Sequence, residues 1–179
     1  MIILGIDPGT ATTGFGLVET KKGQDFKLLD FGWIKTPKED NTEVRLKSIH
    51  QQMLKLLKVS KPDILSIERL FFATNVKTAM AVSESTGVIR LAAAQRKIPV
   101  ISYTPMQIKL VVAGSGRASK DEVKKEVRKL LKFRSPNHKK THFDDVCDAL
   151  AVAICHARKS MVNWNKEQKE VNKTKNGGC

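Results

Sequence analysis

The sequence has no apolar run approaching the roughly 18 to 20 residues that are needed to cross a membrane. It also lacks the marks of an export signal, since no basic region precedes the apolar residues 1–6 and no small-residue cleavage site follows them. No internal repeat is present. The length of 179 residues and the hydrophobic content of 41% are typical of one ordinary globular domain. We therefore expect a soluble, cytoplasmic protein.

Cysteine and histidine are too few and too scattered to indicate a disulfide framework or a zinc site. The three cysteines cannot all pair with one another and show no CxxC spacing, and Cys147 and Cys155 fall on one predicted helix. The four histidines lack the spacing of zinc ligands. This usage favours reduced thiols in a cytosolic protein.

Acidic residues are few relative to basic ones. Thirty-two Lys and Arg residues against eighteen Asp and Glu residues give a net charge of +14. The segment from Pro105 to Lys140 alone contains eleven basic and three acidic residues, a local excess of eight. A concentrated basic patch favours a polyanionic partner such as nucleic acid, although a solvated surface that keeps the protein in solution would show the same excess.

Three short apolar runs near the N-terminus predict an antiparallel meander. Pro8-Gly9 begins a turn after the first run, and residues 21–24 resemble a second turn. The predicted strands are residues 1–7, 14–19 and 26–34.

From residue 41 onward, helical and strand patterns alternate. Asn41 or Thr42 caps a first helix, Thr104-Pro105 begins another, and Ser119 to Glu122 matches the capping box S-x-x-E. The alternation implies right-handed crossovers and parallel strands, so we predict an α/β fold with a mixed sheet. The expected elements are helix 44–57, strand 64–67, helix 76–96, strand 100–102, two helices after Thr104 and Ser119, and a buried helix from 143 or 144 to 158.

The last part of the sequence differs in composition. Residues 161–179 are rich in Asn, Lys and Glu and end in Asn-Gly-Gly-Cys, which offers little apolar area to bury. We therefore predict one domain over residues 1–160 and a polar, disordered tail over residues 161–179.

Two acidic residues end predicted buried strands. Asp7 closes an apolar run before Pro8, and Glu68 follows the run at 64–67. A carboxylate at such a position is costly to bury unless it is hydrogen-bonded, paired or bound to a cation. Turn closure by Asp before Pro-Gly is the simpler interpretation of Asp7 taken alone.

Two further acidic residues lie on the last predicted helix. Asp145 and Asp148 are three residues apart near its start, so both project from one face, whereas Asp144 points elsewhere. Helix starts favour Asp for electrostatic reasons alone. That preference does not explain four carboxylates at the ends of three buried elements in a chain of net charge +14.

A cluster of carboxylates requires a compensating positive charge. Oxygen-only ligation suits Mg²⁺ or Mn²⁺, and two such ions would support hydrolysis of a phosphodiester. The basic segment could then position a nucleic-acid backbone. Phe71 and Phe72 are candidates to stack on bases, with core packing the simpler expectation for Phe72.

Four segments stand out, and in order they are ILGIDPGTATTGFG, IERLFF, YTPMQIKLVVAGSGRASKDEV and DDVCDALAVAICH. In this order and spacing they resemble the RuvC family of Holliday-junction resolvases, in the RNase H-like superfamily. The resemblance spans about residues 1–158.

The resemblance implies an RNase H-like fold with a five-stranded mixed sheet flanked by helices. It implies a homodimer that acts on four-way junction DNA with two symmetric nicks, together with a branch-migration helicase complex. The four catalytic metal ligands, for two Mg²⁺ ions with Mn²⁺ as a substitute, would be Asp7, Glu68, Asp145 and Asp148. The DNA-binding residues would be Phe71, which is implicated in opening the junction, and the basic residues Lys109, Arg117 and Lys120.

One position departs from the family pattern. Ser85-Thr86-Gly87 stands where the family usually has Ala-Arg-Gly, so a basic residue is missing that would contact DNA or the partner subunit. We hypothesise that Arg90, one helical turn beyond, substitutes for it.

Other functions remain open at this point. The alternatives are a non-catalytic junction-binding protein, another RNase H-like nuclease acting on RNA, and an actin-like ATP-binding domain. The last would need a second duplicated domain, for which the chain has no room.

Overall fold

The computed structural model describes residues 1–21, 25–69, 76–132 and 143–176. A five-stranded sheet forms its centre, in the order β3-β2-β1-β4-β5. β1 pairs antiparallel with β2 and parallel with β4, while β2 and β3 are antiparallel and β4 and β5 parallel. The strands are β1 (Ile2–Asp7), β2 (Thr12–Lys21), β3 (Asp25–Lys35), β4 (Ile64–Glu68) and β5 (Val100–Tyr103).

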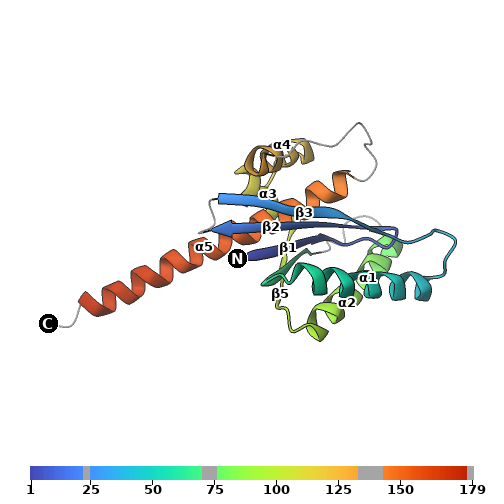
Figure 1. Ribbon diagram of the computed structural model, residues 1–179. Helices are drawn as coiled ribbons and strands as arrows, with labels where there is room; N and C mark the ends of the chain where they lie inside the picture. The colour runs from blue at the N-terminus through green and yellow to red at the C-terminus, as the bar shows by residue number, and fades with distance from the viewer. Residues whose placement is uncertain (22–24, 70–75, 133–142, 177–179) are drawn as a thin grey trace.

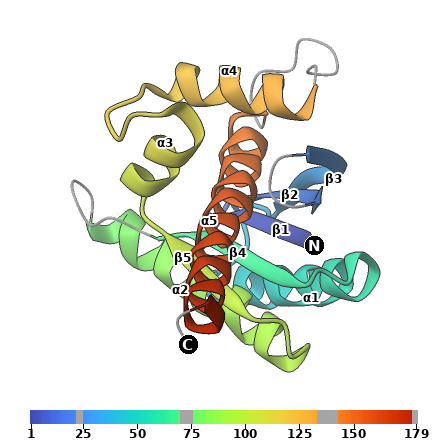
Figure 2. The same cartoon turned by 90° about the vertical axis from the view of Figure 1, so that its left-hand side faces the viewer.

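Five helices cover the two faces of this sheet (Figures 1 and 2). Successive strand residues face opposite sides, so that Leu4 and Ile6 of β1 pack with α1 and α2, whereas Ile3 packs with α3, α4 and α5. Each face therefore has its own apolar core. The helices are α1 (Thr42–Ser60), α2 (Val76–Gln95), α3 (Pro105–Ala113), α4 (Lys120–Leu131) and α5 (Phe143–Asn176).

The predicted α/β fold with a mixed sheet and an N-terminal meander is confirmed. The cap predictions are also confirmed: Asn41 caps α1, and Thr104 and Ser119 begin capping boxes at α3 and α4. β2 starts at Thr12 rather than at residue 14, because pairing with β3 extends through the Thr12–Lys35 pair. Cys147 and Cys155 are buried and free.

The end of the last helix was predicted wrongly. α5 continues to Asn176 instead of ending at residue 158, and its C-terminal part projects beyond the sheet (Figure 1). The predicted helix end at residue 158 is therefore wrong, while the disorder predicted for residues 161–179 stays a prediction. Extending a formed helix needs no new nucleus, and the Lys, Glu and Gln residues of this segment are good helix formers. The division of the chain at residue 160 into a domain and a separate tail stays a prediction.

Among the described helices, none combines the length and apolar character that spanning a lipid bilayer requires.

Candidate active site

The parallel pairing of β1 and β4 places two of the predicted carboxylates side by side. Ile6 is paired with Ile67, and each strand ends one residue later, at Asp7 and Glu68. Both side chains leave the same edge of the sheet on the face that α5 covers, as the alternation of strand residues requires. Strand ends of this kind are where open α/β sheets bind ligands.

Two glycines bring α5 against the sheet at this edge. Gly14 of β2 is the cross-strand partner of Asp7 on β1, and a Cβ at Gly14 would lie 2.3 Å from the backbone oxygen of Asp145. A Cβ at Gly5 would lie 2.0 Å from the backbone oxygen of Ala149. The first turns of α5 can rest on β1 and β2 only because these positions have no side chain. The helical acidic residues are thereby held next to Asp7.

A cleft of about 410 Å³ opens at this junction of β1, β4, α3, α4 and α5. It contains three of the four predicted carboxylates and two of the predicted DNA-binding lysines. Asp145 does not line it, but its Cβ lies 3.0 Å from where a Cβ on Gly14 would stand, and Gly14 is the cross-strand partner of Asp7. Its charge also raises the pKa of Asp7. The lining residues are Asp7, Pro8, Glu68, Arg69, Pro105, Ile108, Lys109, Lys120, Val123, Asp148 and Ala151.

Burial and mutual repulsion raise the pKa of two carboxyl groups in the cleft. Burial raises the pKa of Asp7 to about 8, with further increases from the charges of Glu68, Asp148 and Asp145. Burial, followed by the charge of Asp148, raises the pKa of Glu68 to about 7. Without an added cation, Asp7 and Glu68 are therefore only partly ionised at neutral pH. Several carboxylates cannot all be charged in a poorly solvated site.

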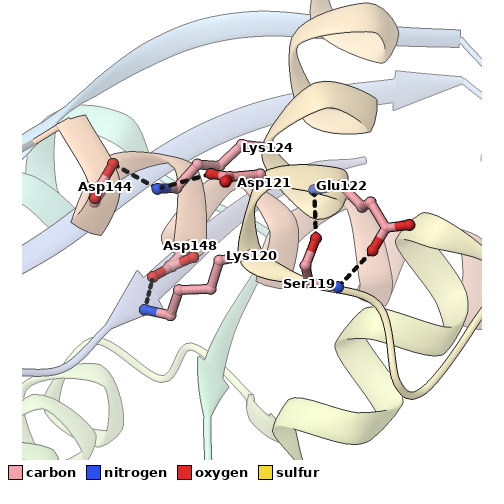
Figure 3. Close-up of polar contacts among 7 residues, drawn as sticks. All are labelled: Ser119, Lys120, Asp121, Glu122, Lys124, Asp144 and Asp148. Carbon is pink, nitrogen blue, oxygen red and sulfur yellow. Dashed lines mark hydrogen bonds and ion pairs between the residues drawn. The ribbon is translucent and has the colours of Figure 1, made fainter.

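Lys120 provides part of the missing positive charge. Its Nζ lies 3.1 Å from Oδ2 of Asp148. Figure 3 shows the two side chains joined by this ion pair. The charge of Asp148 is also the main reason that the pKa of Lys120 is raised. Asp144 points away from the cleft, as expected, and pairs with Lys124 at 2.7 Å.

The donor set fits a hard divalent cation. The cleft presents carboxylate oxygens, the ligands that Mg²⁺ and Mn²⁺ prefer, and the raised pKa of Asp7 and of Glu68 marks a demand for positive charge. Within the part of the chain that the structure describes, no three acidic, histidine or cysteine side chains lie close enough to hold a metal ion as they stand. Asp148 is instead engaged by Lys120.

The remaining predicted site residues do not line the cleft or lie outside the described residues. Arg117 is exposed but does not line the cleft, and Phe71 and Phe72 lie outside the described residues. Thr86 donates a hydrogen bond to the carbonyl of Val82 within α2, while the exposed Arg90 donates one to the hydroxyl of Ser102 on β5.

Sequence reasoning missed Arg69 and the two contact glycines. Arg69 lines the cleft directly after Glu68, and its backbone N–H donates to the carbonyl of Tyr103 at 2.7 Å. Gly5 and Gly14 stand in apolar strands, where glycine is unfavourable unless another backbone approaches closely. That rule was the available signal for both.

Comparison with known proteins identifies one family, both by its family model and by individual relatives. The family model described as crossover junction endodeoxyribonuclease RuvC matches residues 3–156. A protein of that name from Moorella thermoacetica is 46% identical, over 96% of this chain and 98% of its own length. Another, from Alkaliphilus oremlandii, is 46% identical over 88% of this chain and 93% of its own length.

Solved structures extend the similarity to the fold. The structure of T. thermophilus RuvC in complex with Holliday junction substrate superposes with a TM-score of 0.83 at 32% identity, covering 91% of this chain and 96% of that one. The four predicted carboxylates lie inside the region that the family model matches.

Proposed function

The chain belongs to the crossover junction endodeoxyribonuclease RuvC family, with its RNase H-like fold, and on that premise we propose that it resolves Holliday junctions by paired symmetric nicks. The observation that carries the proposal is the cleft, in which Asp7, Glu68 and Asp148 face Lys109 and Lys120. Acids that would hold cations thus lie beside bases that would hold a phosphate backbone. The reaction is hydrolysis of a phosphodiester bond in DNA, in homologous recombination and repair.

The carboxylates would hold the metal. Asp7, Glu68 and Asp148 from the cleft, together with Asp145, are the proposed ligands of two Mg²⁺ ions, for which Mn²⁺ would substitute. When bound, such ions supply an activated water and stabilise the leaving oxygen during in-line displacement. Binding of these ions would also keep all four carboxylates ionised at neutral pH.

The basic residues would orient the DNA. Lys109 and Lys120 reach the cleft from α3 and α4, whose capping boxes fix the start of each helix. Their ammonium groups would contact phosphates next to the scissile bond. Arg117, exposed after α3, would extend this contact, and Phe71 remains the proposed residue that opens the junction.

A homodimer would supply the second nick. Met80, Gly87 and Leu91 fall on one face of α2, because they are seven and eleven residues apart at 100° per residue. Met80 and Leu91 are 59% and 52% exposed, and a Cβ at Gly87 would meet nothing within 4 Å. This exposed, partly apolar face supports contact with a second copy, and two-fold symmetry suits a four-way junction. A branch-migration helicase partner and a cytoplasmic location are also proposed.

The alternatives are less well supported. A protein that only binds junctions would have no need for buried carboxylates that repel one another. A nuclease acting on RNA and an actin-like ATPase both disagree with the family match and with the junction-bound structural relative.

A cleavage assay tests the proposal. The protein is incubated with Mg²⁺ and either a mobile four-way junction or a linear duplex, with Asp7→Asn as the control. We expect paired nicks in the junction that ligase can reseal and that the control does not make. Binding without cleavage would favour the junction-binding alternative, and equal cutting of the duplex would contradict junction resolution.

A further inference from the structure

The Lys120–Asp148 pair is asymmetric in its access to solvent. Lys120 is the first residue of α4 and follows the N-cap Ser119, so its backbone is anchored by the capping box. Its side chain is nevertheless 71% exposed, whereas that of Asp148 is 19% exposed. The lysine end of the pair can therefore move into solvent, while the aspartate end stays in the cleft.

The charge of Lys120 acts on three of the four proposed metal ligands. It lowers the pKa of Asp7 and of Glu68, against the burial and the neighbouring carboxylates that raise both. Lys109, the other lysine in the cleft, lowers only the pKa of Glu68. Lys120 is thus in contact with one proposed metal ligand and acts electrostatically on two others.

Lys124, on the same helix, differs from Lys120 in the exposure of its side chain. Its side chain is only 13% exposed and its Nζ lies 2.7 Å from Oδ1 of Asp144. Neither residue lines the cleft, and Figure 3 shows their side chains joined by an ion pair. α4 thus carries two lysines one turn apart. The largely buried Lys124 pairs with Asp144 at the start of α5, and the exposed Lys120 pairs with the proposed metal ligand Asp148.

We infer that Lys120 is a displaceable counter-ion, which neutralises Asp148 in the free protein and releases it when a DNA phosphate takes the ammonium group. The ammonium group of Lys120 and a divalent cation would repel each other and share the negative charge at Oδ2 of Asp148, so Lys120 weakens metal binding. A phosphate is a second acceptor for the same ammonium group. DNA binding and metal binding would therefore favour each other, and by linkage the coupling is reciprocal. This inference rests on the proposed nuclease function.

The first test measures metal affinity without DNA. Mn²⁺ is titrated into the full-length protein and followed by electron paramagnetic resonance. We expect Lys120→Met to bind Mn²⁺ about fivefold more tightly than the unaltered protein, since a solvent-exposed charge pair at this distance interacts only modestly. Lys120→Arg should bind Mn²⁺ as the unaltered protein does. Lys109→Met, which removes a cleft charge not paired with Asp148, should change the affinity by less than about twofold.

The second test measures junction binding in EDTA, where neither metal nor cleavage intervenes. Asp148→Asn should increase junction affinity by freeing Lys120, and this gain should shrink when Lys120→Met is also present. Asp144→Asn, which removes one acidic charge outside the cleft, is the matched control and should give the same gain with or without Lys120→Met.

The outcomes separate this inference from the proposed function. An Mn²⁺ affinity equal in Lys120→Met and in the unaltered protein, or raised equally by Lys109→Met, overturns the counter-ion role and leaves the nuclease proposal intact. A gain from Asp148→Asn that is the same in both backgrounds also overturns it. If the unaltered protein binds no Mn²⁺ that Asp7→Asn removes, the proposed metal site fails and the inference fails with it.

Discussion

The backbone oxygen of Asp145 occupies the space that a side chain at Gly14 would fill, 2.3 Å from the position of a Cβ there. Because Gly14 is the cross-strand partner of Asp7, this contact sets the position of α5 relative to the first carboxylate. A backbone atom cannot move aside as a flexible side chain can.

Gly14→Ala should therefore destabilise the protein and displace the start of α5. We expect a loss of at least about 2 kcal/mol in the free energy of unfolding, as for other overpacked positions, together with loss of cleavage. Urea denaturation and the junction assay measure the two effects. Gly116→Ala is the control for the urea measurement, since the close contact of its methyl group would be with the exposed side chain of Met106, which can move aside. Equal stability of the two variants would contradict the role of the contact.

Glu68→Gln should abolish cleavage without abolishing junction binding. The amide retains the shape of the side chain but removes a charged metal ligand, and loss of metal-supported stabilisation lowers the rate by about a hundredfold or more. Single-turnover cleavage and gel-shift assays separate the two quantities. Asp144→Asn removes an acidic side chain outside the cleft and should cleave normally. A Glu68→Gln enzyme of full activity would exclude this carboxylate from the site.

Without metal, the stability of the protein should fall as pH rises. The pKa of Asp7 is about 8 in the folded protein against an ordinary 3.8, so the folded state binds the proton more tightly. This contribution is complete below about pH 4 and is lost as pH rises through 8. Unfolding free energies in EDTA from pH 5 to 8 should decline more steeply for the unaltered protein than for Asp7→Asn. Adding Mg²⁺ at pH 8 should restore stability to the unaltered protein alone. Parallel pH slopes for the two proteins would contradict the raised pKa.

Arg90→Ala should weaken junction binding at low salt. Arg90 is exposed on α2 and is tied to Ser102 of β5, one turn beyond the position where Thr86 replaces the family's usual arginine. If Arg90 contacts a phosphate, the variant should reduce the salt dependence of binding by about one counterion. Arg96, an exposed arginine just after α2, provides the matched alanine control. A salt slope unchanged in Arg90→Ala would remove Arg90 from the DNA contacts.

Removing residues 162–179 should leave folding and cleavage intact. Among the residues whose burial the structure describes, Ala157 is the last in the apolar core that includes α5, and the family match ends at residue 156. We expect an unchanged melting temperature and an unchanged cleavage rate for the shortened chain. A drop in melting temperature of several degrees would show that the projecting part of α5 stabilises the domain.

The parts of the site that the sequence could predict were those set by local rules. Asp7 and Glu68 end apolar runs, and the three-residue spacing of Asp145 and Asp148 places both on one helical face. Strand alternation and capping residues are local in the same sense, and they predicted the sheet and most helix starts correctly.

What the sequence could not predict depends on contacts between distant segments. The contact of α5 with Gly5 and Gly14 joins residues more than a hundred positions apart in the sequence. No periodicity within either segment reveals this contact. The salt bridge between Lys120 and Asp148 depends on how α4 and α5 pack together. The end of α5 was missed for the opposite reason, because low apolar content argued against order although helix propagation needs little apolar burial.

The backbone contact of α5 with Gly5 and Gly14 makes the acidic side of the cleft more rigid than the side that carries Lys120. Asp7, Asp145 and Asp148 stand on β1 and α5, which are in direct backbone contact, whereas the amino group of Lys120 is carried on an exposed side chain. We therefore expect a nucleic acid that enters the cleft to adapt to the acidic side, with the elastic cost of any bending falling on the DNA. Rigidity next to the scissile bond would then be a means of discriminating between DNA shapes.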